Sequence, residues 1–291
     1  MTMLYPLNKS ITFYIRRLWD TLKNTEVEEK WALKKEELEK KIRKSKLNTS
    51  MMNVKTSISK AKSLSIWIFV IPFLGVNICL LLITQFHGLF PNQEDVILNT
   101  FPYLDGGTSI SRAARPFPSW LIFKPTMIFT SFLLIKYWLY NKEIIQYFEE
   151  NHKHLKKILI FGIASAIALT IHSIFLGIKF DNDLYKLFRR VIMLLFIIFE
   201  ILAQAYLVAT LYSLKDKLTE YLNAKILRLK LILVSTLIIV AAISVPIISL
   251  PGNDFFGFNL KFLKHALEWD YFLGVITFYL LTFLMWKNKN N

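Results

Sequence analysis

Long apolar runs that exclude charged residues dominate the pattern of this chain. Five of them cover about 64–86, 120–140, 158–178, 191–214 and 231–250, and a shorter sixth covers about 271–286. A helix of roughly 18 or more apolar residues crosses a hydrocarbon core about 30 Å thick, at a rise of about 1.5 Å per residue. The pattern therefore predicts an all-α fold, a polytopic six-helix transmembrane bundle, and it excludes a compact soluble enzyme.

Polar segments surround these runs. Residues 1–63 form a basic segment before the first span, residues 87–119 form a long outer loop, and residues 287–291 form a short tail. Over residues 26–43, acidic residues precede basic residues by four positions, which predicts a solvated helix stabilised by pairs worth a few tenths of a kcal/mol each. Residues 48–63 are rich in Ser, Thr and Asn, and we expect a flexible basic linker there.

The first part of the basic segment has an amphipathic pattern. Apolar residues recur at helical spacing over residues 11–22, Trp19 lies at the edge of that face, and Arg16, Arg17 and Lys23 lie elsewhere on the helical wheel. This pattern is typical of a helix that lies in a membrane interface. We therefore expect Arg16, Arg17, Trp19 and Lys23 to contact the membrane surface.

The net charge of +15 arises from 36 Lys and Arg residues against 21 Asp and Glu residues. The distribution of the basic residues along the chain predicts how the chain is oriented in the membrane. With a cytosolic N-terminus, 26 basic residues fall on the cytosolic face and nine at most on the other. The positive-inside bias then predicts that both termini are cytosolic, or on the matrix side of a mitochondrial membrane, since residues 1–24 also resemble a presequence. The membrane would be an endomembrane or plasma membrane in a eukaryote and the inner membrane in a bacterium.

The same charge bears on partners. The basic segment lacks the interleaved aromatic residues of a nucleic-acid platform, so we expect no nucleic acid as a partner. A basic segment beside a bilayer is typical of binding to anionic lipid on the cytosolic face. Other membrane protein subunits remain a second class of partner.

Three polar residues interrupt the apolar spans. Glu200 lies near the middle of the fourth span, Gln204 lies one turn further on the same face, and His172 lies about 10 Å by helical rise from the outer end of the third span. His172 is within reach of Glu200 if these antiparallel spans pack together. The three residues form a candidate site for protons or a polar headgroup, or a hydrogen-bonded contact that sets helix packing, and the pattern favours the packing contact.

The long outer loop has a distinctive composition. An aromatic and proline-stiffened stretch with Phe101 and Tyr103 leads to Asp105 and a glycine turn, and Arg112 and Arg115 follow. One interpretation is a structured cap on the mouth of the bundle. The other is a binding surface made by these five residues for a lipid headgroup, a glycan or a partner loop, in which the arginines bind phosphate bidentately.

At this loop the chain resembles the Frag/DRAM/Sfk-like family of six-span membrane proteins, which includes damage-regulated autophagy modulators and GPI-anchor lipid-remodelling factors. Family members carry a Phe-Pro-Tyr-Ile-Ser-Asp-Thr-Gly-like stretch in their first outer loop. Here residues 101–103 match, Leu104 is conservative, and the acidic residue is displaced by one place. Topology agrees over about 64–286, but the basic first 63 residues depart from the family. Family members often carry a Glu followed by an aromatic residue in their last helix, whereas Glu200 lies in the fourth span. No functional residue is therefore transferred to Glu200.

Signals for catalysis or metal binding are weak. The single cysteine, Cys79, lies inside an apolar run and allows no intrachain disulfide. His152 and His154 are two residues apart and lie on different helix faces, without a Cys or acidic cluster to complete a ligand set. No glycine-rich phosphate loop, nucleophile elbow or zinc-protease motif is present. We therefore predict no catalytic residue, no cofactor and no metal ligand.

Three functions are consistent with these patterns. The resemblance implies a non-catalytic integral membrane protein that regulates membrane lipid organisation or trafficking. The alternative is an accessory or assembly subunit of a larger membrane complex, for example a respiratory one, docked through the charged N-terminal helix. The third is a lipid-modifying enzyme or transporter that uses His172 and Glu200.

Overall fold

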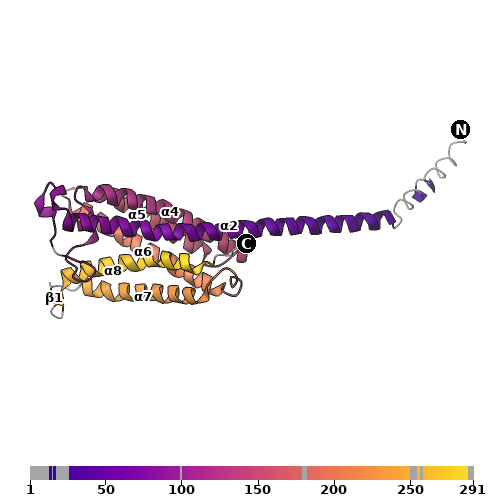
Figure 1. The fold of residues 1–291 in the computed structure, drawn as a ribbon. Coiled ribbons are helices and arrows are strands. Elements are labelled where there is room, and N and C mark those ends of the chain that lie inside the picture. Colours follow the sequence, from indigo (N-terminus) through magenta and orange to yellow (C-terminus); the bar gives the residue numbers. More distant parts are fainter. Residues whose placement is uncertain are drawn as a thin grey trace, which may run out of the picture. The chain divides into compact units, whose positions relative to one another are not determined.

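The computed structural model describes residues 13–14, 16–17, 26–98, 100–178, 182–249, 254–255 and 258–287. It consists of two units, Met1–Asn53 and Val54–Asn291, each of which is described by itself. The helices are α2 (Glu26–Gln85), α3 (Ile110–Ala114), α4 (Ser119–Phe148), α5 (Leu155–Phe175), α6 (Asp183–Ser213), α7 (Ala224–Ser249) and α8 (Leu260–Met285) (Figure 1). Two short 3-10 helices, η1 (His87–Leu89) and η2 (Gln93–Asp95), precede α3.

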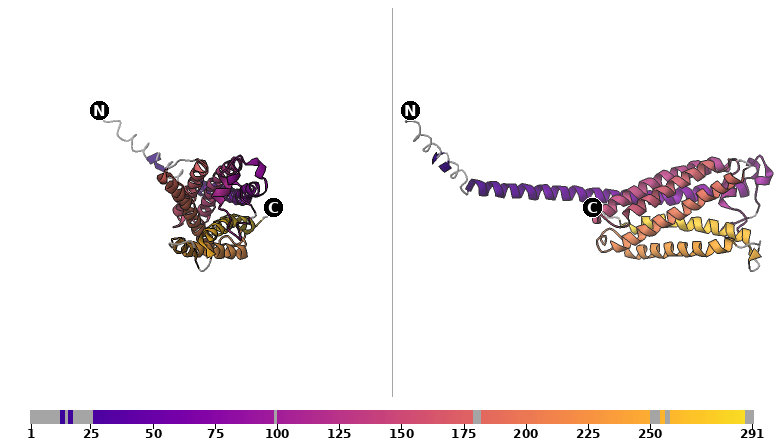
Figure 2. Two further views of the ribbon diagram at one scale, coloured as in Figure 1. Left: turned by 90° about the vertical axis from the view of Figure 1, so that its left-hand side faces the viewer. Right: turned by 180° about the vertical axis from the view of Figure 1, so that it is seen from behind.

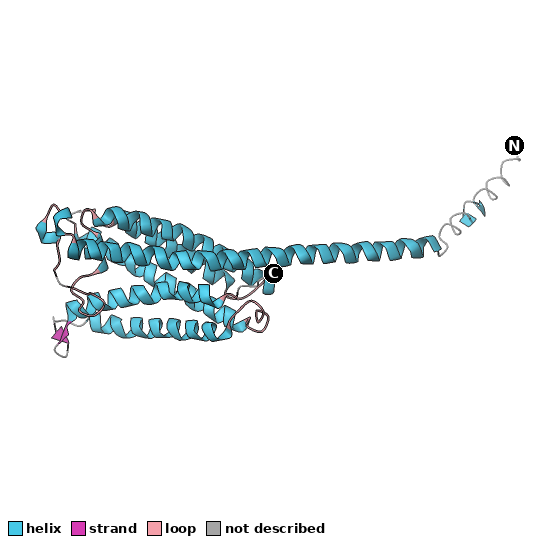
Figure 3. Cartoon of the chain, in the orientation of Figure 1, coloured by secondary structure: helices cyan, strands magenta, loops and turns pink. Residues whose placement is uncertain are grey.

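Six helices in the described part of the chain are long and apolar enough to cross a membrane. The candidate spans are Lys30–Gln85, Ser119–Phe148, Leu155–Phe175, Asp183–Ser213, Ala224–Ser244 and Leu260–Met285. The predicted helical class is therefore confirmed (Figure 3). The six candidate spans also match the six predicted apolar runs in number. The described strands, β1 (Asp254–Phe255) and β2 (Phe258–Asn259), form an antiparallel pair of two residues each between α7 and α8.

Several helices extend beyond the apolar runs that predict them. Helix α6, which contains the fourth predicted span, begins at Asp183 instead of residue 191. Asn182 Oδ1 caps it by accepting from the backbone N–H of Leu184 at 2.9 Å. The last helix has 26 residues, from Leu260, where the apolar run has 16. Charged residues in its first turns hide this extension from the hydropathy pattern, whereas buried Leu260 and Trp269 hold those turns against the bundle.

The flexible linker predicted for residues 48–63 is wrong, because this stretch lies inside α2. Val54, Ile58 and Ala61 are buried in the core of the second unit. Ser57 also donates a hydrogen bond to Glu143 Oε2 of α4 at 2.5 Å. Tertiary packing thus overrides the weak helix propensity of Ser and Thr, and the boundary between the units falls after Asn53 instead of after residue 63.

The helices of the second unit pack in chain order. In this unit α4 contacts α5, α5 contacts α6, α6 contacts α7 and α7 contacts α8. Figure 2 shows these helices side by side from behind in its right-hand view and from one end of the bundle in its left-hand view. Between α4 and α5 the helices approach closely, since a Cβ on Gly162 would lie 2.5 Å from ring atoms of Trp138. Small residues at such contacts are typical of helices that associate in membranes.

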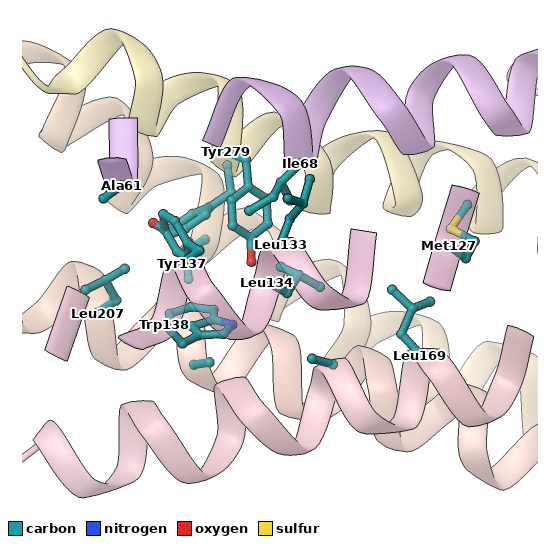
Figure 4. Close-up of a cluster of buried hydrophobic side chains, with 14 of the residues drawn as sticks. Ala61, Ile68, Met127, Leu133, Leu134, Tyr137, Trp138, Leu169, Leu207 and Tyr279 are labelled. Atoms are coloured by element: carbon teal, nitrogen blue, oxygen red, sulfur yellow. The ribbon is translucent and has the colours of Figure 1, made fainter. Parts of the chain in front are cut away.

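The core of this unit is rich in aromatic residues. Tyr137 and Trp138 of α4 are fully buried, and Tyr137 packs edge-on against Tyr279 of α8 with ring centroids 5.1 Å apart. Aliphatic side chains, among them Leu134 and Leu207, surround these rings (Figure 4). The buried rings supply much of the packed surface that joins α4 to α8.

The two ends of the bundle are distinguished by the segments that they carry. The end that carries residues 87–118 and the α5–α6 and α7–α8 connections is called the long-loop end. At the opposite end, where α8 ends and α7 begins, the backbone N–H of Asn223 donates to Met285 O at 2.9 Å, and Lys62 Nζ donates to Trp286 O at 2.7 Å. These bonds attach the end of α8 to α2 and to the α6–α7 connection.

The first unit is helical and solvated wherever the structure describes it. Ion pairs join Glu36 to Lys40 at 2.6 Å and Glu37 to Lys41 at 2.7 Å, as the four-residue spacing predicts. Arg16 and Arg17 are exposed and helical. Trp19 and Lys23, the other predicted membrane-surface contacts, lie outside the described residues.

Candidate functional site

A carboxyl group lies inside the bundle on α6, where Glu200 is only 1% exposed. Ser165 of α5 donates to its Oε2 at 2.7 Å, and Gln204 Nε2 donates to its Oε1 at 3.0 Å. The hydroxyl of Tyr279 on α8 donates to the same Oε1. Gln204 also donates to the carbonyl of Val275 at 3.2 Å. Both carboxyl oxygens therefore bond to side chains, and the group joins α5, α6 and α8.

A lysine is buried between α7, α8 and α4. Lys230 is 0% exposed, and its Nζ donates to the hydroxyl of Thr282 at 2.7 Å. The same nitrogen lies 3.8 Å from the ring centroid of Phe278, and Tyr137 reaches the Thr282 hydroxyl at 3.3 Å. The usual partner of a buried amine is a carboxylate. Here a hydroxyl group and the face of an aromatic ring stabilise the amine instead.

His172 lies away from the Glu200 contact. The residue of α5 that reaches Glu200 is Ser165, seven positions or about 10 Å of helical rise from His172. His172 lies in the last turn of α5, at the long-loop end, and Arg189 is its charged neighbour. The structure therefore brings Glu200 and Gln204 together, as the spacing predicts, but does not bring His172 to them.

Asp105 organises the glycine turn of the long loop. Its carboxylate accepts from the backbone N–H groups of Phe101 at 2.7 Å and Gly107 at 2.8 Å, and from the Thr100 hydroxyl at 2.7 Å. Slight burial raises the pKa of Asp105, but these hydrogen bonds outweigh it and hold that pKa below its usual value. Asp105 is thus occupied within its own turn.

The loop is fixed to the start of α8. The carbonyl of Gly106 bonds to His265 Nδ1 at 2.9 Å, and Trp269 Nε1 donates to the carbonyl of Thr108 at 2.8 Å. Gly106 has a φ of 62°, and a Cβ there would lie 1.8 Å from the carbonyl oxygen of Phe262, so only glycine fits. Tyr103 packs on Trp269 with ring centroids 5.0 Å apart, and burial raises the pKa of its phenol. These contacts agree with a structured cap.

The five residues of the predicted outer surface therefore separate into three groups. Tyr103 and Asp105 hold the loop together, and Phe101 remains 56% exposed. Arg112 is exposed, whereas Arg115 is partly buried against the α5–α6 turn. Burial, and next the nearby charge of Arg189, lower the pKa of Arg115.

The two histidines before α5 have packing contacts of their own. His152 Nε2 lies 3.3 Å from the Ser213 hydroxyl, and the His154 ring lies 5.2 Å from that of Tyr206. Within the described ranges, no three His, Cys, Asp or Glu side chains are grouped so that they could hold a metal ion.

Four residues of these clusters escape a sequence-based search. Ser165 and Tyr279 are ordinary residues of apolar helices, and nothing in their spacing marks them as partners of Glu200. Lys230 precedes an apolar run and resembles a loop charge, although α7 begins six residues earlier, at Ala224. Arg189 likewise lies just before the apolar run of α6, and only the observed start at Asp183 places it inside the helix.

Comparison with known proteins yields no relative. No protein-family model matches the chain, and no curated protein or solved structure is significantly similar to it.

Proposed function

We propose that this chain is a non-catalytic multi-pass membrane protein that organises membrane lipid, as its resemblance to Frag/DRAM/Sfk-like proteins implies. The observation that carries the proposal is a rigid loop that displays large apolar side chains. Phe101 and Leu104 are 56% and 83% exposed, although the turn that contains them is held by Asp105 and by α8, and Leu98, which precedes that turn, is 66% exposed. These three residues are called the apolar loop tip.

An exposed apolar tip on a fixed loop needs a partner of matching chemistry. Large apolar side chains in water are unfavourable by about 25 cal/mol per Å² of exposed surface. At the end of a transmembrane bundle, the nearest apolar phase is the lipid leaflet that surrounds the helices. A lipid headgroup is one of three ligands, with a glycan and a partner loop, that the sequence allows for the binding-surface interpretation of this loop.

The outer surface of the bundle supports placement in a bilayer. Phe132 of α4, Ile160 of α5 and Ile232 of α7 are 60%, 64% and 62% exposed. Large apolar side chains exposed on several neighbouring helices are uncommon on soluble monomers and normal on surfaces that face lipid. Basic residues are in excess on the side of the spans that carries both chain termini. This excess supports cytosolic termini and electrostatic attraction to anionic lipid on that side.

The proposal predicts that the apolar loop tip enters the lipid leaflet. A Leu104→Cys variant carrying an environment-sensitive fluorophore should show blue-shifted emission in vesicles and quenching by a quencher attached to the lipid chains. Cys79 is 1% exposed and should not compete for the label. Asn92→Cys is the matched control, because Asn92 is an exposed polar residue of the same loop.

The outcome of this experiment is decisive for the tip. If the label at position 104 responds to aqueous quenchers as strongly as the label at 92, the tip does not contact lipid. In a second measurement, a Phe101→Ser and Leu104→Ser double variant should retain less lipid after purification in mild detergent, as measured by mass analysis. Unchanged lipid retention would contradict a lipid-organising role for the loop.

A specific observation favours the second candidate, an assembly subunit. In the first unit, Trp31, Leu38 and Ile42 are 69%, 58% and 46% exposed on a helix that is rich in charged residues. Their spacing of seven and four residues places them on one stripe of a helix, which is typical of a surface that docks a partner helix.

Deleting residues 1–47 distinguishes these two functions. A lipid-organising protein should remain inserted and keep its lipid, because the deleted residues belong to the first unit. A subunit should instead be released from its complex, seen as a lower native mass after mild-detergent purification. A triple Trp31→Ser, Leu38→Ser, Ile42→Ser variant is the matched control that keeps the length and charge of the helix, and release by this variant would favour the subunit.

The geometry gives less support to a lipid-modifying enzyme or transporter built on Glu200 and His172. The carboxyl oxygens of Glu200 already accept from Ser165, Gln204 and Tyr279. His172 lies about two helical turns from that contact. This arrangement is typical of a packing contact between helices.

A further inference from the structure

Three cationic or potentially cationic side chains converge at the long-loop end from separate elements. Arg115 is the C-cap of α3, His172 lies in the last turn of α5, and Arg189 lies in the second turn of α6. Arg115 Nε, His172 Nδ1 and Arg189 Nε are all buried without a hydrogen-bond partner in the described part of the chain. These three residues are called the cationic cluster.

The α5–α6 turn brings the cluster together. A Cβ on Gly177 would lie 3.2 Å from the Arg115 carbonyl oxygen and 3.9 Å from its Cγ, so Arg115 rests against this turn. On α6, the guanidinium carbon of Arg189 lies 5.9 Å from the Tyr185 ring centroid. Tyr185 in turn donates to the carbonyl of Phe175 at 2.8 Å, which ties α6 to the end of α5 beside His172.

Capping of α5 does not explain the arginines. Basic side chains often bond to the last carbonyl groups of a helix. At the end of α5 three of these carbonyl groups already have partners: Lys124 Nζ donates to Ile174 O at 3.1 Å, Tyr185 donates to Phe175 O, and the Leu176 N–H donates to His172 O at 3.0 Å. Arg115 Nε and Arg189 Nε, which have no partner in the described part of the chain, therefore remain available to another acceptor.

The charges of the cluster are poorly balanced. Arg189 acts electrostatically on both Arg115 and His172, and Arg112 adds further repulsion on Arg115. Asp95 is the described acid that opposes this repulsion at Arg115, and it forms no ion pair with it in the described structure. Partly buried like charges with unpaired donors are stabilised when an anion binds between them.

We propose that the cationic cluster of Arg115, His172 and Arg189 binds the phosphate of a phospholipid headgroup or of a free phosphate anion. Guanidinium groups bind phosphate oxygens bidentately, and the imidazole adds a donor from α5. The cluster lies at the ends of α5 and α6, the depth at which headgroup phosphates meet spanning helices. The inference is independent of the apolar loop tip, because none of its three residues belongs to that tip.

The test uses the full chain in maltoside micelles, which contain no phosphate. Phosphatidic acid should raise the unfolding temperature, whereas diacylglycerol, which differs from it by the phosphate alone, should not. Inorganic phosphate is titrated against chloride at equal ionic strength to separate the two sources. Stabilisation by both probes assigns the site to phosphate in general, and stabilisation by phosphatidic acid alone assigns it to the lipid.

Variants locate the effect. Arg189→Gln and Arg115→Gln should weaken binding of the stabilising probe by about 10- to 100-fold, the effect of losing hydrogen bonds to a charged group. Arg190→Gln is the matched control, because Arg190 is the next residue of α6 and is exposed. Arg189→Lys keeps the charge and the fold but loses the bidentate geometry, so it should bind more weakly than the natural chain.

Two outcomes would overturn the proposal. In the first, phosphatidic acid raises the unfolding temperature of the natural chain no more than diacylglycerol does, and inorganic phosphate raises it no more than chloride does. The other is an equal loss of binding in Arg190→Gln and Arg189→Gln, which would show general charge attraction instead of a site. If Arg189→Gln does not fold, the comparison of Arg189→Lys with Arg190→Gln decides the question.

Discussion

Replacing Glu200 with alanine should destabilise the folded bundle by about 2 to 4 kcal/mol. Two of the donors to Glu200 have another acceptor, since Ser165 also donates to Gly162 O at 2.9 Å and Gln204 to Val275 O at 3.2 Å. The hydroxyl of Tyr279 bonds to Glu200 in a fully buried position and would lose its acceptor. The expected loss therefore combines an unpaired hydroxyl on α8 with the cavity left by the carboxyl group.

Glu200→Gln is the matched variant for this experiment. Its amide keeps one acceptor oxygen for Tyr279 and Gln204, and its NH2 group can donate to the Ser165 hydroxyl. We therefore expect Glu200→Gln to cost about 1 kcal/mol or less. The measurement is equilibrium unfolding in mixed micelles of a mild detergent and SDS, with Tyr279→Phe and the Glu200→Gln, Tyr279→Phe double variant completing a mutant cycle.

Two results would count against a packing role. If Glu200→Gln destabilises as strongly as Glu200→Ala, the carboxyl group itself is required. That result would favour a site for protons or a polar headgroup at Glu200. If neither variant changes stability while lipid retention falls, Glu200 acts on lipid and contributes little to packing.

The sequence predicts the spans well because a bilayer imposes a strong rule on composition. An apolar run of sufficient length has few alternatives to a spanning helix, so six runs give six candidate spans. Helix ends are less predictable. The start of α6 depends on the cap supplied by Asn182, and the start of α8 depends on contacts of Trp269 with the long loop.

The candidate sites are predicted in part. The shared face of Glu200 and Gln204 follows from helical periodicity alone, and the structure confirms it. Their partners on other helices depend on the relative heights of α5, α6 and α8, which a single sequence does not contain. A shift of two turns between α5 and α6 would be needed to bring His172 to the level that Ser165 occupies. Lys230 is missed for a similar reason, because its burial comes from Phe278 and Thr282 on α8.

Introducing a side chain at Gly162 should separate α4 from α5. A Cβ at this position would lie 2.5 Å from two atoms of the Trp138 ring and 2.7 Å from a third, and Trp138 is 0% exposed. Alanine gains up to about 1 kcal/mol of helix propensity over glycine, which offsets part of the clash. Gly162→Val adds bulk without that gain, so we expect it to destabilise the bundle by about 3 kcal/mol or more.

The control and the rescue use other positions of the same chain. Gly88→Val should change stability by less than about 0.5 kcal/mol, because a Cβ at Gly88 meets no atom within 4 Å. Combining Gly162→Val with Trp138→Leu should recover part of the loss, since the smaller side chain leaves room for valine and neighbouring substitutions are not additive. Mixed-micelle unfolding measures these three variants and the Trp138→Leu single variant, whose loss enters the sum. A tolerated Gly162→Val, or a double variant no more stable than the sum of the single losses predicts, would show that α4 and α5 do not meet at this contact.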